Sequence, residues 1–312
     1  TIILKDKKEV VDYKKIEKEF KKYVQLWRDI RDEKIIPLPS GIDKTDTPWR
    51  DYANKILLQS NDMTLLPGVG KAYRANIQQV FGIKSIDELR GISENALVEL
   101  FDSPIGTSIY NHARAYNSKS YMPINENPHI DRRKRSLYFD IETSDEVSKT
   151  DPPHTYLIGL WDKELDKFVY FLGKGKKDEE KIWKDFLDYI GNLKEAYLYH
   201  WASYEQGMID ETIKQYPKLA PRLEELKKSC VDLLEVVKSN YYIPVPTYSI
   251  KKVAPYLGFN WRQKDVGAFE SMVLYWDWLE NPEQKIIDKV LKYNEDDCKA
   301  MKFIDEKLFN EL

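Results

Sequence analysis

The sequence predicts an α/β domain with a mixed sheet, preceded by an all-helical region. Helical patterns without strand patterns account for the chain from residue 10 to residue 116. From residue 136 the pattern changes to short runs rich in aromatic and β-branched residues, separated by turn-like breaks. Beyond these runs, helical and strand patterns alternate, which is typical of a mixed sheet. The 312 residues amount to about two domains of roughly 150 residues each.

The composition is that of a globular protein. Hydrophobic residues make up 42% of the chain and charged residues 32%, enough for buried cores and a hydrated surface. These values exclude a disordered or collagen-like chain, and no apolar run approaches the roughly 20 residues of a membrane-spanning helix. The two cysteines, Cys230 and Cys298, lie far apart and in no ligand-like spacing. We therefore expect no disulfide framework, no zinc cage and a reducing, cytoplasmic location.

Charge is distributed unevenly along the chain. Residues 1–135 hold 24 basic and 19 acidic residues, and residues 136–312 hold 25 basic and 33 acidic ones, which gives net charges of +5 and −8. This asymmetry fits a basic anchoring half joined to a half whose carboxylates hold cations. Unevenly charged, hydrated surfaces are the alternative.

The helical region begins with one long amphipathic helix, predicted over residues 10–34. Pro37, Pro39 and Gly41 then mark a loop, and a short helix follows at residues 49–60. A compact module of four further helices is predicted at residues 72–81, 85–89, 94–101 and 107–116.

Two glycines, Gly68 and Gly70, flank Val69 immediately before the helix 72–81. Glycine permits a positive φ and a close approach of the backbone to a ligand, and a helix start offers unpaired amides to an anion. Lys71 and Arg74 would add positive charge beside a phosphate. The segment is no Walker loop, because the GxxxxGK[ST] spacing is missing and no strand precedes it. A tight helix–helix turn without a ligand is the alternative.

A degenerate copy of this pattern lies at residues 103–108. Pro104 replaces the first glycine, and Gly106 is the second. We expect this copy to serve helix packing rather than phosphate contact.

The polar segment 117–135 contains Pro123 and Pro128 and marks the boundary between the two halves. It ends in the basic run 132–135, which could protect a strand edge or contact phosphate. Five strands follow, predicted at residues 136–143, 154–161, 167–172 and 196–201 and near Cys230. Helices are predicted at residues 179–193, 204–215, 220–227, 233–239, 249–257 and 282–309.

Three acidic residues of the second half point to a metal. Asp140 and Glu142 share one face of the strand 136–143, because side chains alternate along a strand. Two carboxylates so placed repel each other unless water separates them or a cation, such as a divalent metal, lies between them. Asp297 lies on the apolar stripe of the helix 282–309, where it needs a cation or strong hydrogen bonds. Tyr293 lies one turn earlier, and Asp296, about 100° around the helix, is expected in solvent.

Glu205 lies in the first turn of the helix 204–215, directly after the strand 196–201. Sites of α/β sheets gather at the carboxyl ends of strands. Taken alone, Glu205 is an ordinary acid favoured by the helix dipole.

Together these segments resemble the tyrosine branch of the DEDD exonucleases, in the RNase H-like superfamily. The order is D-x-E at residues 140–142, an aromatic residue and an acid at residues 204–205, and Y-x-x-x-D at residues 293–297. The segments 249–259 and 293–300 are similar to the RNase H-like domain found fused to RecB-family nucleases. The Gly68–Gly70 hairpin resembles the helix-hairpin-helix module that precedes that domain.

The resemblance implies three parts of the chain. Residues 1–60 would be a helical segment whose first 36 residues resemble the end of a RecB-like domain, which implies a fragment of a longer protein. Residues 61–135 would be a helix-hairpin-helix domain with its linker. Residues 136–312 would be an RNase H-like exonuclease domain with a mixed five-stranded sheet flanked by helices.

The resemblance also implies the chemistry. Asp140, Glu142, Glu205 and Asp297 would hold two Mg²⁺ or Mn²⁺ ions, and Tyr293 would hold the attacking water. The substrate would be single-stranded nucleic acid, DNA rather than RNA, degraded from its 3′ end to nucleoside 5′-monophosphates. The backbone-binding residues, which read no bases, would be Gly68, Val69, Gly70, Lys71 and Arg74. The chain departs from the family at Glu205, where the family ordinarily has Asp.

Two other functions are alternatives. A non-catalytic nucleic-acid-binding module of a larger nuclease would use the same fold. The presence of Glu205, where the family ordinarily has Asp, favours this alternative. A structure-specific RNase H-like endonuclease would share the metals but cleave circular single strands. Lys251 could contact phosphate or lie on a hydrated helix face. Stacking on bases, with core packing as the alternative, is considered for Trp201, Tyr204, Trp261 and Tyr275.

Overall fold

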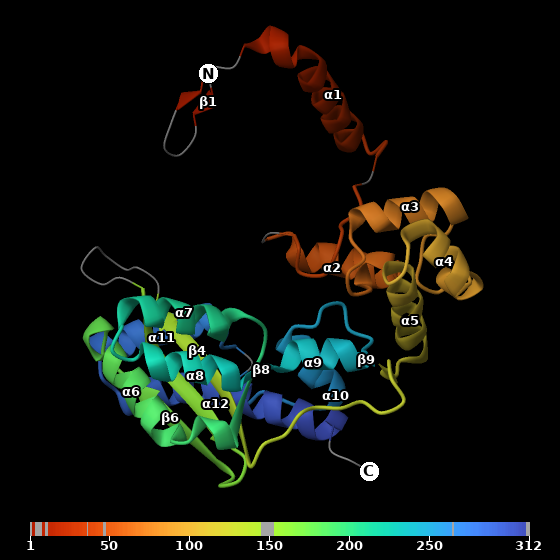
Figure 1. The fold of residues 1–312 in the computed structure, drawn as a ribbon. Coiled ribbons are helices and arrows are strands. Elements are labelled where there is room, and N and C mark those ends of the chain that lie inside the picture. Colours follow the sequence, from red (N-terminus) through yellow and green to blue (C-terminus); the bar gives the residue numbers. More distant parts are fainter. Residues whose placement is uncertain are drawn as a thin grey trace. The chain divides into compact units, whose positions relative to one another are not determined.

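The computed structural model describes residues 2–3, 8–9, 12–35, 37–45, 48–144, 153–263 and 265–309. The chain divides into two compact units, Thr1–Ser60 and Asn61–Leu312 (Figure 1). Across the described ranges, no helix is both long enough and apolar enough to cross a membrane. Both cysteines are free thiols.

The described residues of the first unit form one pair of short strands and two helices. Strand β1 (Ile2–Ile3) pairs antiparallel with β2 (Lys8–Glu9), and α1 (Tyr13–Arg31) and α2 (Arg50–Gln59) follow. The long helix predicted over residues 10–34 is confirmed as α1. Residues 10 and 11 lie outside the described residues, as do residues 1 and 4–7. Helix α1 has no buried residue; on its apolar stripe Phe20 and Leu26 are exposed, and Ile16, Val24 and Ile30 are half-buried.

The second unit begins with a helical module. It comprises a 3₁₀ turn η1 (Met63–Leu65), α3 (Lys71–Phe81), a second turn η2 (Glu88–Gly91), α4 (Glu94–Phe101) and α5 (Ile105–Ser118). Helices α4 and α5 approach each other at Gly106, where an added Cβ would lie 2.5 Å from the carbonyl carbon of Leu97. The second glycine pattern therefore serves close helix packing, as expected for it.

The remainder of the unit is built on a five-stranded mixed sheet, which confirms the predicted fold class. The strands are β4 (Arg135–Ser144), β5 (His154–Asp162), β6 (Lys167–Leu172), β7 (Ala196–His200) and β8 (Cys230–Asp232). Their order is β6-β5-β4-β7-β8. The pairs β4–β5 and β5–β6 are antiparallel, and β4–β7 and β7–β8 are parallel.

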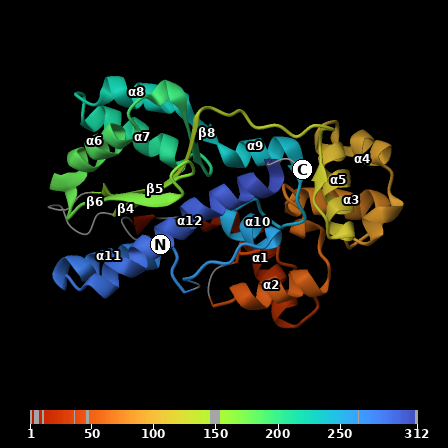
Figure 2. The ribbon, with the colours of Figure 1, turned by 90° about the horizontal axis from the view of Figure 1, so that it is seen from below.

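Helices cover both faces of the sheet (Figure 2). One face packs against α6 (Glu179–Ile190), α7 (Tyr204–Gln215) and α8 (Ala220–Ser229). The other face packs against α10 (Ile250–Leu257), α11 (Ala268–Glu280) and α12 (Gln284–Phe309). Because Leu137, Phe139 and Ile141 of β4 belong to the first core, Asp140 and Glu142 face α12.

The segment between the helical module and the sheet is held in place by strand pairing and by its arginines. Strand β3 (Met122–Pro123) pairs with β9 (Tyr241–Tyr242), which follows α9 (Leu233–Asn240). The arginines of the basic run bind protein groups: Arg132 pairs with the Asp305 carboxylate, Arg133 donates to the carbonyls of Leu193 and Ala196, and Arg135 donates to Asp162. These contacts hold the three arginines against the sheet domain, as expected for residues that protect a strand edge.

Helix α12 lies close to the sheet at one glycine. Gly159 of β5 pairs with Asp140 of β4 in the antiparallel register. A Cβ added to Gly159 would lie 1.6 Å from Oδ1 of Asn294 on α12. The missing side chain therefore allows Asn294 to reach the sheet beside Asp140.

We expect Gly159→Ala to displace α12 and to lower the free energy of unfolding by about 1–3 kcal/mol, the usual cost of overpacking. Urea unfolding measures this. Gly207→Ala is the matched control, since Gly207 lies in α7 and no atom lies within 4 Å of its added Cβ; it should be neutral or slightly stabilising. Equal stability of Gly159→Ala and wild type would contradict this account of the α12 contact.

Candidate metal centre

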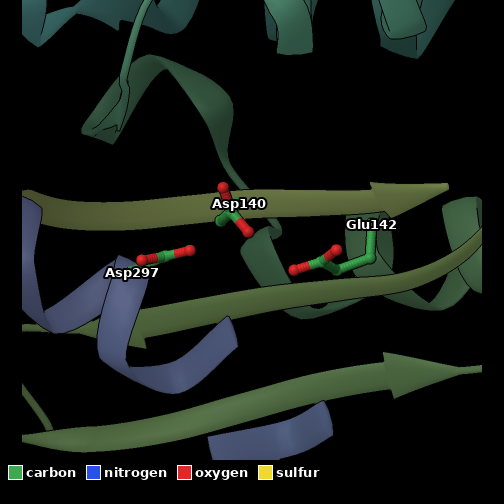
Figure 3. A group of neighbouring side chains, drawn as sticks. All are labelled: Asp140, Glu142 and Asp297. Atoms are coloured by element: carbon green, nitrogen blue, oxygen red, sulfur yellow. The ribbon is translucent and has the colours of Figure 1, made fainter. Parts of the chain in front are cut away.

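Three carboxylates converge where α12 crosses β4. Asp140 and Glu142 project from the strand and Asp297 projects from the helix (Figure 3). Each offers one oxygen, and these oxygens all lie within 4.8 Å of one another. Of the four acids that the sequence places in one site, these three lie together, and Glu205 lies outside the group.

The close approach of these carboxylates is electrostatically unfavourable. Burial raises the pKa of Asp140 well above its usual value, and the charges of Glu142, Asp297 and Glu205 raise it further. Burial and the charge of Asp297 raise the pKa of Glu142 to about 8. A divalent cation would relieve this repulsion, and hard oxygen ligands suit Mg²⁺ or Mn²⁺. The donor set therefore fits such a metal.

Asn294 holds Asp140 in place. Its Nδ2 donates to Oδ2 of Asp140 at 2.7 Å and lies 3.3 Å from the Asp140 carbonyl oxygen. Sequence reasoning did not identify Asn294 as part of the site, although it follows Tyr293 directly. The contact depends on the missing side chain at Gly159, which no local pattern indicates.

Asp297 is held by two donors. Lys251 Nζ lies 2.5 Å from Oδ1 of Asp297, and Trp261 Nε1 donates to the same oxygen at 2.8 Å. The ammonium also lies 4.3 Å from the centroid of the Trp261 ring and 4.4 Å from that of the Tyr293 ring. Burial still raises the pKa of Asp297, although Lys251 and Trp261 oppose the shift.

Glu205 is buried at the start of α7, outside the group of three but close enough for its charge to raise the pKa of Asp140. His200 Nδ1 lies 3.5 Å from Oε2 of Glu205, but it donates to the Ala202 carbonyl at 2.6 Å. Among the described residues, this Oε2 has no hydrogen-bond partner. A buried carboxylate oxygen without a donor is suited to a cation.

Tyr293 lies one turn before Asp297 and is buried. Burial, together with the charges of Asp297, Glu142 and Asp140, raises its pKa far above the usual value. The hydroxyl is therefore protonated at neutral pH and acts as a hydrogen-bond donor.

The glycine hairpin of the helical module has the predicted geometry at its turn. Gly68 has a φ of +77°, Val69 is buried, and Gly70 precedes α3 without a side-chain cap. Lys71 is exposed. Arg74, expected to add positive charge beside a phosphate, is buried, and its guanidinium lies 3.0 Å from the Asp62 carboxylate inside the module.

Two further expectations are corrected. Asp296 is buried rather than in solvent, because the opposite side of α12 is covered by Arg262, whose backbone amide and Nε donate to its carboxylate at 2.8 and 2.6 Å. Tyr275 is unavailable for stacking on bases, because it is buried against Tyr156 with ring centroids 3.9 Å apart. Of the other aromatic candidates, Tyr204 is 49% exposed, and Trp261 is half-buried beside Asp297.

The raised pKa of Glu142 predicts a pH-dependent stability. Because the pKa rises from 4.5 to about 8 on folding, folding favours the protonated acid. This contribution is fully present below pH 4.5 and is lost as the pH rises through about 8. At about pH 8 the metal-free Glu142→Gln protein should therefore be more stable than the wild type. The difference in the free energy of unfolding should be on the order of 1–3 kcal/mol.

Thermal and urea unfolding across this pH range measure the difference. Mn²⁺ should raise the unfolding temperature of the wild type more than that of Glu142→Gln. Glu211→Gln, at an exposed ion pair with Lys214 on α7, is the control and should keep the wild-type pH profile. Parallel profiles for Glu142→Gln and wild type would contradict the assignment.

A family model agrees with this architecture. A family model described as RNase_H superfamily matches residues 137–309, and no curated protein is detectably similar in sequence. A family B DNA polymerase from the hyperthermophilic archaeon Pyrobaculum calidifontis has a similar region, with a TM-score of 0.35 and 16% identity. The similarity covers 58% of this chain but only 25% of the polymerase chain. With more than half of its residues matched by the family model, including both strand acids and Asp297, the chain belongs to the RNase H superfamily.

Proposed function

We propose that the protein is a two-metal-ion 3′–5′ exonuclease that hydrolyses single-stranded nucleic acid, with DNA favoured over RNA, to nucleoside 5′-monophosphates. The observation that carries the proposal is the convergence of Asp140, Glu142 and Asp297 within 4.8 Å. The buried Tyr293 beside them and the RNase H-like fold support it.

The residues present fit a pair of divalent ions. Asp140, Glu142 and Asp297 would hold them, together with Glu205, whose buried Oε2 accepts no hydrogen bond from the described residues. Bound Mg²⁺ or Mn²⁺ supplies Lewis-acid stabilisation of the charge that develops on phosphate oxygens.

The chain's own side chains complete the chemistry. Asn294 fixes the orientation of Asp140 through its hydrogen bond. Tyr293, protonated at neutral pH, donates a hydrogen bond that orients the attacking water. Lys251, beside Asp297, adds a positive charge close to the reacting phosphate.

The helical module would anchor the substrate. Its Gly68-Val69-Gly70 turn presents the first amides of α3 without a side-chain cap, and such amides bind phosphate. Lys71 would add a counter-charge, whereas Arg74 would support the module from inside through Asp62. The free thiols Cys230 and Cys298 fit a reducing cytoplasm.

A non-catalytic nucleic-acid-binding module is the second candidate, and one observation favours it. Lys251 neutralises Asp297 directly, so that the fold holds this carboxylate with a protein cation. Mn²⁺ calorimetry separates the two functions, because a binding module should show no tight metal uptake that depends on the carboxylates.

Loss of one metal ligand tests the enzyme. Asp140→Asn and Asp297→Asn should each lower 3′-end hydrolysis by about 100-fold or more, as typical for a lost electrostatic contact to developing charge. The assay uses 3′- and 5′-labelled single-stranded DNA and RNA with Mg²⁺ or Mn²⁺. Asp210→Asn is the control, since Asp210 on α7 pairs with Lys227 outside the carboxylate group.

The outcomes separate the candidate functions. Wild-type rates in both metal-ligand variants would remove the nuclease proposal. Cleavage of circular single strands would identify an endonuclease.

Substitution of one lysine tests the anchor. Lys71→Ala should weaken single-stranded DNA binding several-fold and should lower the slope of log affinity against log salt by about 1. Fluorescence anisotropy at several salt concentrations measures both. Lys84→Ala, at an exposed position just beyond α3, is the control; an equal effect of the two variants would contradict a specific anchor at the hairpin.

A further inference from the structure

A pocket of about 440 Å³ lies on the helical module, between the turn η2 and the second half of α5. The α5 residues that line it are spaced three or four apart and therefore share one face of the helix; they are Tyr110, Ala113, Arg114, Asn117 and Ser118. Leu89 and Arg90 of η2 complete the lining. The volume lies within the range of about 300–1,000 Å³ that is usual for small-ligand sites.

The lining carries two positive charges. Arg90 and Arg114 are both exposed at the pocket, and no Asp or Glu is among the described residues that line it. Buried Leu89 and Ala113 give the pocket an apolar base. Guanidinium groups bind phosphate oxygens through paired hydrogen bonds. A phosphate ester, with its charge and its less polar ester group, therefore fits the lining.

The charge of Arg114 is not neutralised by the protein. Its Cζ lies 5.6 Å from the centroid of the Tyr110 ring, and its Nη1 lies 3.5 Å from Oδ1 of Asn111. Among the described residues, no carboxylate forms an ion pair with it. Arg74 and Arg132, by contrast, are each bound to a carboxylate. The guanidinium of Arg114 is therefore available to an anion in the pocket.

Arg90 has only a weak partner. Its Nη2 lies 3.8 Å from Oδ1 of Asp87, and the two side chains are 63% and 65% exposed. Exposed ion pairs of this kind contribute little to stability. A phosphate that contacts Arg114 can therefore also bind Arg90 in place of this pair.

The pocket differs in kind from the glycine hairpin. The hairpin presents amides at the start of a helix, whereas the pocket lies along the second half of α5, towards the negative end of the helix dipole. The other donors of the lining are occupied: Asn117 Nδ2 lies 3.3 Å from the Ile86 carbonyl oxygen, and Ser118 Oγ donates to a carbonyl of its own helix at 3.0 Å. Binding of an anion here therefore depends on the two arginines.

We propose that this pocket is a second binding site for the nucleic-acid strand, in which Arg90 and Arg114 bind one phosphate group. The Tyr110 ring and the apolar base of the pocket lie beside the adjoining nucleoside. The phosphate belongs to the interior of the strand or to its 5′ end. The inference rests on the proposed nuclease function, which supplies the strand as the ligand, and it adds a contact that the hairpin does not make.

Loss of one guanidinium tests the site. Arg114→Ala should weaken binding of fluorescein-labelled single-stranded oligothymidine about 2- to 5-fold, the range for one exposed ion pair. The slope of log affinity against log salt should fall by about 0.7, the value for one phosphate contact on a single strand. Fluorescence anisotropy in EDTA measures both without hydrolysis. Arg222→Ala is the matched control, since Arg222 of α8 pairs with Asp188 outside the pocket. Equal affinities and slopes for Arg114→Ala and the wild type would overturn the site.

Removal of the carboxylate beside Arg90 should have the opposite effect. Asp87→Asn frees Arg90 from its ion pair and should tighten binding of the same oligonucleotide. Asp188→Asn frees Arg222 in the same way, away from the pocket, and should leave the affinity nearly unchanged. Equal tightening by the two variants would indicate a general effect of charge and would contradict the pocket.

Chemical footprinting locates the phosphate. Phenylglyoxal modifies accessible guanidinium groups, and single-stranded DNA should slow the modification of Arg114 but not that of Arg222, as measured by mass spectrometry. A strand with a 5′ phosphate, the same strand with a 5′ hydroxyl and a circular strand are compared. Protection by all of them indicates an interior phosphate, and protection by the first alone indicates the 5′ end.

Other footprints would overturn the proposal. These are protection of neither arginine, equal protection of both, and protection of Arg114 by thymidine monophosphate but by no strand.

Failure of this site and failure of the nuclease give different results. Binding that depends on Arg114, in a protein that leaves labelled DNA intact, would support the site and remove the nuclease alone. Hydrolysis by a protein whose DNA binding is unchanged in Arg114→Ala would remove the site alone.

Discussion

The close contact of α12 with the sheet at Gly159 is the constraint on which the candidate site depends. Asp140 lies opposite Gly159 in the β4–β5 register, and the missing side chain leaves the space that Asn294 fills. Asn294 then binds Asp140, and the same helix brings Asp297 within 4.8 Å of both strand acids. The β4–β5 register, the position of α12 and the geometry of the three carboxylates therefore depend on one another.

That geometry is unfavourable without a cation, because buried carboxylates repel one another and lose hydration. The fold compensates in two ways. Lys251, Trp261 and Asn294 provide direct partners for Asp297 and Asp140. Apolar cores on both faces of the sheet supply the stability that the acidic group removes. A group of buried carboxylates that lowers stability in this way is typical of a functional site rather than of core packing.

Local patterns were sufficient for much of the fold and for part of the site. All five strands of the mixed sheet were predicted, the first three because each is an aromatic and β-branched run between breaks, and alternation placed Asp140 and Glu142 on one face. The short pairs β1–β2 and β3–β9 were not predicted. Helix α11 was missed because its apolar residues lie on most of its sides, which leaves no one-sided stripe. Arg74, Asp296 and Asn294 could not be placed, since their partners Asp62, Arg262 and Gly159 depend on tertiary packing.

Helix α12 also links the carboxylate group to the segment that follows α10. Adjacent residues of one turn point in different directions, so that Asp297 enters the carboxylate group while Asp296 holds Arg262. Trp261, the residue before Arg262, itself donates to Asp297. Movement of this helix would therefore displace Asp297 and Trp261 together, so that the orientation of the carboxylate and the position of this segment are expected to be coupled.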